Sequence, residues 1–278
     1  MEEVDTVVQA IVIGVVQGLT EFLPISSSGH LIVVPYLLGW DDALVNSLAF
    51  SVILHLGTLV ALLVFFWRDW LRLVPAGLAA LRDRSFNGDP DRRLAWLIAA
   101  TLPPAIAVGI LLHDAIESTL RQPALVAAML VVGSAIMWLA DRLGRKVLPV
   151  ERLSFAGAVG VGCAQALALV PGISRSGVSI SAGLAFGLTR EAAARFSFLM
   201  ATPIIAGAGA WETRMLLAGE AGVALDPLVL VAGFAASAAA GLLAVAVLLR
   251  YLRTHPLTVF IVYRLVLAAV ILFVFLEV

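Results

Sequence analysis

The chain has 278 residues, of which 62% are hydrophobic and only 13% charged, and its mean hydropathy is +1.04. A soluble domain carries roughly a quarter charged residues, so this composition excludes an ordinary soluble fold and predicts a membrane protein. The net charge of −1 gives no reason to expect a nucleic-acid partner, and the single cysteine excludes an internal disulfide and a metal site built on several thiolates.

The first apolar region, residues 7–39, is interrupted by the sequence QGLTEFLPISSSGH, Gln17–His30. The apolar stretch before Gln17 is expected to be too short to cross a bilayer, which takes about 20 residues. Pro24 is expected to end one helix, and the serines that follow resemble the start of another. We therefore predict a re-entrant helix–loop–helix hairpin, because non-helical backbone at membrane depth is tolerated only inside protein or beside a wet cavity.

Three long apolar stretches follow, then a second interrupted region, and then three more apolar stretches. The second interrupted region, residues 154–190, contains PGISRSGVSIS, and we interpret it as a second re-entrant hairpin. The chain is thus predicted to be an all-α, polytopic membrane protein with two re-entrant hairpins and six transmembrane helices, at about 46–67, 94–113, 123–140, 194–212, 227–249 and 257–277.

Positive charge is distributed unevenly between the connecting segments. Most of the 18 lysine and arginine residues fall on one side of the predicted topology, in segments 68–93, 141–153, 190–195 and 250–256. Cytoplasmic loops of membrane proteins are enriched in lysine and arginine. These segments are therefore expected inside the cell, and both chain termini outside.

The two halves of the chain resemble each other when Gly14 is aligned with Gly162. The identical pairs then include Gln17 and Gln165, Ser26 and Ser174, and Ser28 and Ser176. We predict a single membrane domain, 1–278, made of repeat one, 1–150, and repeat two, 151–278, each with one hairpin and three spans. Three crossings are an odd number, so the repeats are inverted and the hairpin tips can meet near the middle of the membrane, as in many transporters.

The polar residues of the two tips predict a binding site for an anion. Glu21 and Arg175 would each cost at least about 2.5–3.5 kcal/mol within the bilayer unless paired, hydrated or bound to a ligand, so a function is expected for both. Two helix N-termini with hydroxyl groups and an arginine suit phosphate oxygens. The residues expected to contact the anion are Ser26, Ser28, Gly172, Ser174 and Ser176.

A phosphoester substrate gives each remaining polar group a role. Ser27 can attack phosphorus if a base takes its proton, and His30, one helical turn later, can be that base. Arg175 would neutralise charge on the transferred phosphoryl group. Glu21 and Gln17, four residues apart on one helix face, would hold a divalent cation, Mg²⁺ or Ca²⁺. A single carboxylate suffices for this only if the substrate is a diphosphate that supplies further oxygen ligands.

The motifs QGLTEFLPISSSGH and PGISRSGVS, with the rest of the chain, resemble the undecaprenyl-diphosphatase family, bacterial membrane enzymes linked to bacitracin resistance. The resemblance implies hydrolysis of undecaprenyl diphosphate to undecaprenyl phosphate and inorganic phosphate, which recycles the lipid carrier of cell-wall synthesis at the bacterial inner (plasma) membrane. By this resemblance, the functional residues of the family correspond to Gln17, Glu21, Ser27, His30 and Arg175. Either Ser27 or His30 would be the nucleophile. This chain departs from the family pattern at Gln17, where glutamate is commoner, and at Ser179, where threonine is usual.

The inverted repeat is also typical of transporters, so a lipid-phosphate transporter or flippase is the alternative function. A carrier has no use for a nucleophile and a base on one tip only. The phosphatase hypothesis predicts a polyprenyl diphosphate as substrate, a site open to the periplasmic face, and a homodimer as a possible assembly. Two further polar residues in the predicted spans, His55 and Arg264, are interpreted as interhelical partners. A place lining the site is left open for His55, and snorkelling or a role near the substrate phosphate is left open for Arg264.

Overall fold

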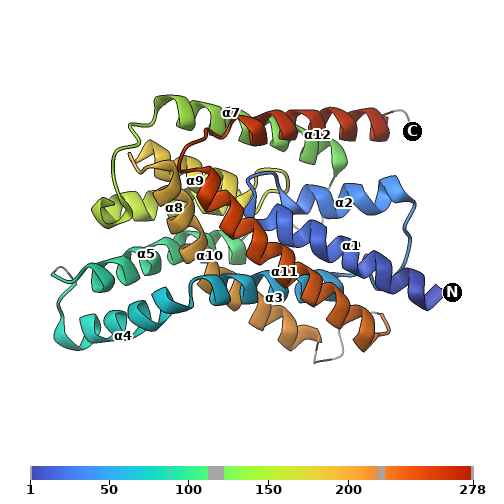
Figure 1. Cartoon of the computed structure of the whole chain (residues 1–278), viewed down its shortest axis with the longest axis horizontal. Coiled ribbons are helices and arrows are strands. Elements are labelled where there is room, and N and C mark those ends of the chain that lie inside the picture. Colours follow the sequence, from blue (N-terminus) through green and yellow to red (C-terminus); the bar gives the residue numbers. More distant parts are fainter. Residues whose placement is uncertain (1, 87, 112–121, 217, 219–222, 277–278) are drawn as a thin grey trace.

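The structure, a computed structural model, describes residues 2–86, 88–111, 122–216, 218 and 223–276. Within these residues all named elements are helices, apart from an isolated β-bridge between Leu148 and Leu188, so the all-α prediction is confirmed (Figure 1). The helices are α1 (Glu2–Phe22), α2 (Ser27–Leu38), α3 (Leu48–Phe65), α4 (Trp67–Asp83), α5 (Pro90–Leu111), α7 (Pro123–Leu143), the short η1 (Val150–Arg152), α8 (Phe155–Leu167), α9 (Arg175–Ala185), α10 (Arg190–Met215), α11 (Pro227–Tyr251) and α12 (Thr258–Leu276).

The six predicted spans are confirmed as long apolar helices, α3, α5, α7, α10, α11 and α12. The ends of two of them, residues 112–113 and 277, lie outside the described residues. One expectation is corrected, because α1 continues through Gln17 and Glu21 and its part Asp5–Phe22 is a seventh candidate span. The polar residues do not end this helix because their side chains are buried against other helices and do not face lipid.

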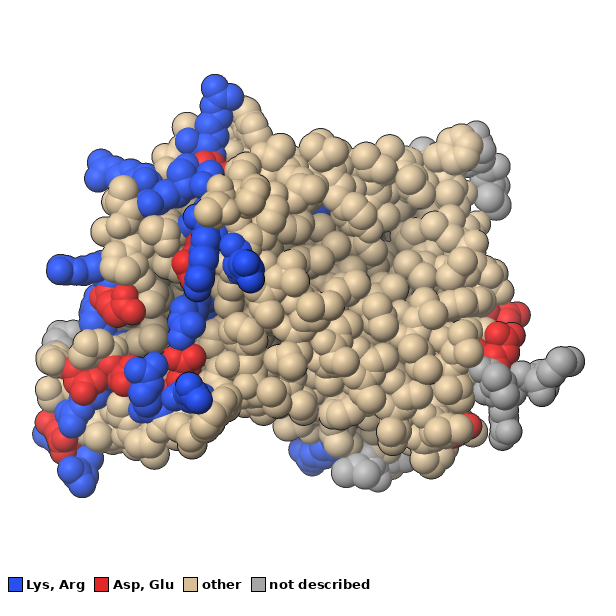
Figure 2. All heavy atoms as spheres, in the orientation of Figure 1, with Lys and Arg blue, Asp and Glu red and all other residues tan. Residues whose placement is uncertain are grey.

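Helix α4 was not predicted. It follows α3 directly, carries arginine and aspartate on its exposed face, and buries only small or apolar residues such as Leu73 and Ala80. Figure 1 places α4 at the end of the molecule opposite to both chain termini. In Figure 2 charged side chains gather at that same end, while most of the remaining visible surface is uncharged. This distribution is that of a multi-pass membrane protein with one strongly charged membrane face.

Both interrupted regions fold as helix–turn–helix units, with short helices α2, α8 and α9. The turn between α1 and α2 contains Pro24, as predicted, and ends at Ser26, which has a φ of 76°. The turn between α8 and α9 ends at Ser174, which has a φ of 74°. Positive φ is uncommon for serine, so its occurrence at equivalent positions of both tips supports their alignment. Entry and exit of each hairpin through one membrane face stay predictions.

The two predicted repeats are also alike in how their first helices pack against a neighbouring helix. Helix α1 packs along α11, and its equivalent α8 packs along α5. A Cβ atom added at Gly14 would lie 2.5 Å from the carbonyl oxygen of Gly233, and one at Gly162 would lie 2.5 Å from that of Thr101. Glycine is therefore required at both positions for the backbones to approach so closely.

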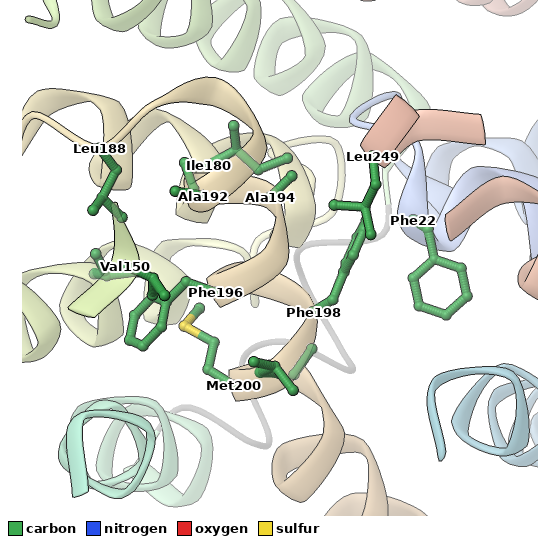
Figure 3. Packing of buried hydrophobic residues seen from close by; sticks show 14 of the residues in the cluster. Phe22, Val150, Ile180, Leu188, Ala192, Ala194, Phe196, Phe198, Met200 and Leu249 are labelled. Carbon is green, nitrogen blue, oxygen red and sulfur yellow. The ribbon is translucent and has the colours of Figure 1, made fainter. Parts of the chain in front are cut away.

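The largest hydrophobic cluster holds the end of α1 in place (Figure 3). Phe22 packs edge-on against Phe198 of α10, with ring centroids 5.5 Å apart, and Leu249 of α11 belongs to the same cluster. An edge-to-face aromatic pair has a defined geometry. Since Phe22 directly follows Glu21, this packing fixes the backbone that carries the carboxylate.

Candidate active site

The two hairpin tips meet at an ion pair. Arg175, the first residue of α9, donates a hydrogen bond from its guanidinium group to Oε1 of Glu21, in the last turn of α1. Ser176 adds a second link, since its hydroxyl donates to the carbonyl oxygen of Leu23 at 3.2 Å. The site is therefore complete only when the tips of both hairpins are docked against each other.

The carboxylate of Glu21 is the centre of a buried hydrogen-bond network. Its side chain is 3% exposed, and Oε2 accepts hydrogen bonds from Ser27 Oγ at 2.7 Å and from Gln17 Nε2 at 3.1 Å. Together with the bond from Arg175, these donors satisfy both carboxylate oxygens. The short contact with Ser27 places Glu21 where it can accept the hydroxyl proton.

His55 of α3 faces this network from the opposite side. Its Nε2 lies 3.7 Å from Glu21 Oε2, and its Nδ1–H donates to the carbonyl oxygen of Ser51 at 2.8 Å. Because Nδ1 carries a proton for that bond, Nε2 can donate toward the carboxylate only when the ring is doubly protonated. His55 thus lies next to Glu21, in the place lining the site that the sequence leaves open for it.

The ring nitrogens of His30 hydrogen-bond to groups other than the Ser27 hydroxyl. The Nδ1–H of His30 donates to the carbonyl oxygen of Ser26 at 2.7 Å, and Nε2 accepts from the hydroxyl of Tyr263 on α12 at 2.7 Å. The rings of His30 and Tyr263 are stacked with centroids 5.6 Å apart. Both ring nitrogens of His30 are thus engaged, and Glu21 is the basic group that hydrogen-bonds to Ser27. A role of His30 as the base stays a prediction.

Arg264 of α12 is fully buried behind the two tips. It donates to the carbonyl oxygens of Gly172 and Ile173 in the second turn, at 2.8 and 3.2 Å, and to that of Pro24 in the first turn, at 3.5 Å. Gly133 leaves the space for it, since an added Cβ would lie 2.2 Å from the guanidinium. Arg264 also donates to Ser134 Oγ and to the carbonyl oxygen of Leu130 on α7, both at 3.1 Å. The interpretation of Arg264 as an interhelical partner is therefore confirmed, and the same side chain bonds to the backbone of both turns.

A cavity of about 340 Å³ opens beside the ion pair. Its lining includes the predicted site residues Glu21, Ser26, Ser27, Ser28, Ser174 and Arg175. A second cavity, of about 290 Å³, shares Ser27 and Ser28 with the first and has apolar walls that include Leu31, Ile32 and Leu54. The first cavity, named the polar cavity because the Glu21–Arg175 ion pair lines it, suits the head group of an amphiphilic lipid. The leucine and isoleucine side chains of the second cavity suit the first part of the lipid chain.

Gly172 and Ser176 are not among the residues that line the polar cavity, and their expected contact with the anion stays a prediction. Gly172 has a φ of 98°, and an added Cβ would lie 2.5 Å from the carbonyl oxygen of Val126, so glycine is required there by the turn. Ser176 links the tips through its bond to Leu23. Sequence reasoning also used Gln165 only to align the repeats, although Gln165 is among the residues that line the polar cavity.

The predicted cation ligands, Gln17 and Glu21, lie side by side. In the described part of the chain, no three His, Cys, Asp or Glu side chains are grouped so that they could hold a metal ion without a substrate. The amide oxygen of Gln17 is buried and has no hydrogen-bond partner among the described residues. Gln17 turns its amide nitrogen toward Glu21 and is not among the residues that line the polar cavity, so a divalent cation held by this pair stays a prediction.

Comparison of the amino-acid sequence with known proteins finds similarity over nearly the whole chain. The family description "Bacitracin resistance protein BacA" matches residues 10–270. Proteins named undecaprenyl-diphosphatase are similar over nearly their whole length. The chain is 47% identical over 263 residues to that of Rubrobacter xylanophilus, covering 95% of this chain and 96% of the relative. It is 45% identical over 271 residues to that of Moorella thermoacetica, covering 97% and 98%. The similarity thus extends over both hairpins.

Proposed function

Because the chain belongs to the bacitracin resistance protein BacA family, we propose that it is a membrane phosphatase that hydrolyses undecaprenyl diphosphate to undecaprenyl phosphate and inorganic phosphate. This reaction recycles the lipid carrier used in cell-wall synthesis. The observation that carries the proposal is the contact of Glu21 with both Ser27 and Arg175 at the junction of the hairpins. Glu21 supplies a base, Ser27 a nucleophile and Arg175 a positive charge. A transporter needs neither the base nor the nucleophile.

Ser27 acts as the nucleophile in this proposal. As its Oγ attacks the terminal phosphorus, its proton passes to Glu21 Oε2, 2.7 Å away. The bond from this phosphorus to the bridging oxygen breaks, and undecaprenyl phosphate leaves with the electron pair. Water then attacks the phosphorus bound to Ser27, and Glu21 returns its proton to Oγ as inorganic phosphate is released.

Arg175 neutralises the transferred phosphoryl group. Its guanidinium lines the cavity and exchanges part of its contact with Glu21 for phosphate oxygens when the substrate binds. The first turns of α2 and α9 begin at Ser27 and Arg175, so both helix N-termini favour the same anion. A divalent cation, Mg²⁺ or Ca²⁺, held by Gln17 and Glu21 would supply further neutralisation of the diphosphate.

Phosphate release by the purified protein tests this function. With undecaprenyl diphosphate labelled on its terminal phosphate, we expect release by the native protein and a labelled phosphoserine at Ser27 after rapid acid quenching. Ser27→Ala is expected to lower turnover by about 10³-fold or more, because the nucleophile is removed. Ser85→Ala, in an exposed loop, is the control. Full turnover by Ser27→Ala, or label on His30, would contradict the assignment.

We also propose that both termini and the active site face the periplasm. The charged end in Figure 2 lies opposite to the termini in Figure 1, and the second cavity reaches Val45, Asn46 and Ser47 in the loop before α3. A reporter fused after Val278 is expected to be active only in the periplasm, and cytoplasmic activity would reverse the orientation. Association into a homodimer stays a prediction.

A further inference from the structure

Gln165 of α8 occupies the position that the repeat makes equivalent to Gln17 of α1. Both side chains are buried, with Gln17 0% and Gln165 3% exposed. Gln17 uses its Nε2 to hold Glu21, four residues later on the same helix face. The residue four positions after Gln165 is Leu169, so the second hairpin has no equivalent carboxylate for its glutamine to hold.

The carboxamide of Gln165 has no hydrogen-bond partner among the described residues, on either its nitrogen or its oxygen. Gln165 is among the residues that line the polar cavity, together with Glu21, Ser27 and Arg175. A buried amide with both atoms unpaired is unfavourable for the folded protein. A ligand in the cavity would remove this penalty by pairing with the amide.

We infer that Gln165 is a substrate-binding residue whose Nε2 donates a hydrogen bond to an oxygen of the diphosphate group. This inference rests on the proposed phosphatase function and extends it, because it assigns the second glutamine of the repeat to the same head group as Arg175. The two equivalent glutamines thus have different tasks. Gln17 orients the base, whereas Gln165 binds the substrate.

The substitution Gln165→Met separates substrate binding from packing. Methionine has a similar length and no hydrogen-bonding amide, so KM is expected to rise about tenfold, with kcat changed less than about twofold. The thermal midpoint should equal or exceed that of the native protein, because an unpaired buried amide is removed. A residue that only packs would instead lower the midpoint and leave KM unchanged.

A matched control is available on α1. Gln9 is also buried and has an unpaired amide oxygen, but it lies outside the polar cavity. Gln9→Met is expected to keep the native KM and kcat. If Gln165→Met does not fold, Gln165→Glu keeps the side-chain length and places a carboxylate beside the diphosphate, so it should raise KM at least tenfold as well.

A binding measurement separates failure of this inference from failure of the proposed function. Methylenediphosphonate, whose P–C–P link cannot be hydrolysed in this way, is titrated into the native protein and Gln165→Met, and its affinity is read from the shift in thermal midpoint. We expect about tenfold weaker binding by the variant. If the native protein releases phosphate while the variant binds the probe equally well with an unchanged KM, the inference is overturned and the function stands. If the native protein releases no phosphate, the proposed function is wrong. The affinities of the native protein and Gln165→Met for methylenediphosphonate then show by themselves whether Gln165 binds a diphosphate.

Discussion

Glu21→Gln is expected to lower phosphate release from undecaprenyl diphosphate by about 10²–10⁴-fold, the range typical of a lost general base. The amide cannot accept the proton of Ser27, and it leaves Arg175 without its negatively charged partner. Steady-state kcat measures the effect, and the thermal midpoint verifies that the variant is folded. Glu191→Gln, which removes an exposed carboxylate paired with Arg253, should stay within about twofold of native activity. Near-native turnover of Glu21→Gln would mean that another group activates the nucleophile.

Arg264→Met is expected to reduce both stability and activity. Each carbonyl oxygen left buried without a donor costs about 1–3 kcal/mol of stability. Arg264 donates hydrogen bonds to the carbonyl oxygens of Gly172, Ile173 and Pro24. A loss of several kcal/mol in the free energy of unfolding follows, together with displacement of both tips.

Arg264→Lys distinguishes positioning from overall folding. It keeps the charge, but a single ammonium group cannot replace the planar guanidinium that reaches both turns. We expect this variant to fold and to have a kcat lowered by at least about tenfold, with a smaller change in KM. Arg82→Met, at an exposed arginine of α4, should leave thermal midpoint and kcat unchanged. Native stability of Arg264→Met would contradict the role of Arg264 in holding the tips.

The long spans could be predicted because an uninterrupted apolar helix has a strong compositional signal. The same criterion failed for α1, where Gln17 and Glu21 lower the hydropathy although their side chains face protein. It also missed α4, because an amphipathic helix at the membrane face has a low mean hydropathy. Hydropathy reports how many polar residues a segment has, whereas burial depends on which neighbours they face.

The meeting of Glu21 and Arg175 could be expected from the inverted repeat, and the structure has these side chains in contact. The surroundings of His30 could not be predicted, because its partner Tyr263 is contributed by the last helix. Helical spacing suggested Ser27 as its neighbour, yet the ring turns to Tyr263 and to the carbonyl of Ser26. The unpaired amide of Gln165 could not be predicted from the sequence either, because hydrogen-bond pairing depends on contacts between helices.

We propose that the two hairpin tips form one site for a diphosphate head group. An experimental structure of the protein with a methylene analogue of undecaprenyl diphosphate is the decisive measurement. We expect the terminal phosphonate to contact Ser27 from the first tip and Arg175 from the second. An analogue bound elsewhere, or to one tip while the other lies too far away to touch it, would rule out a shared site.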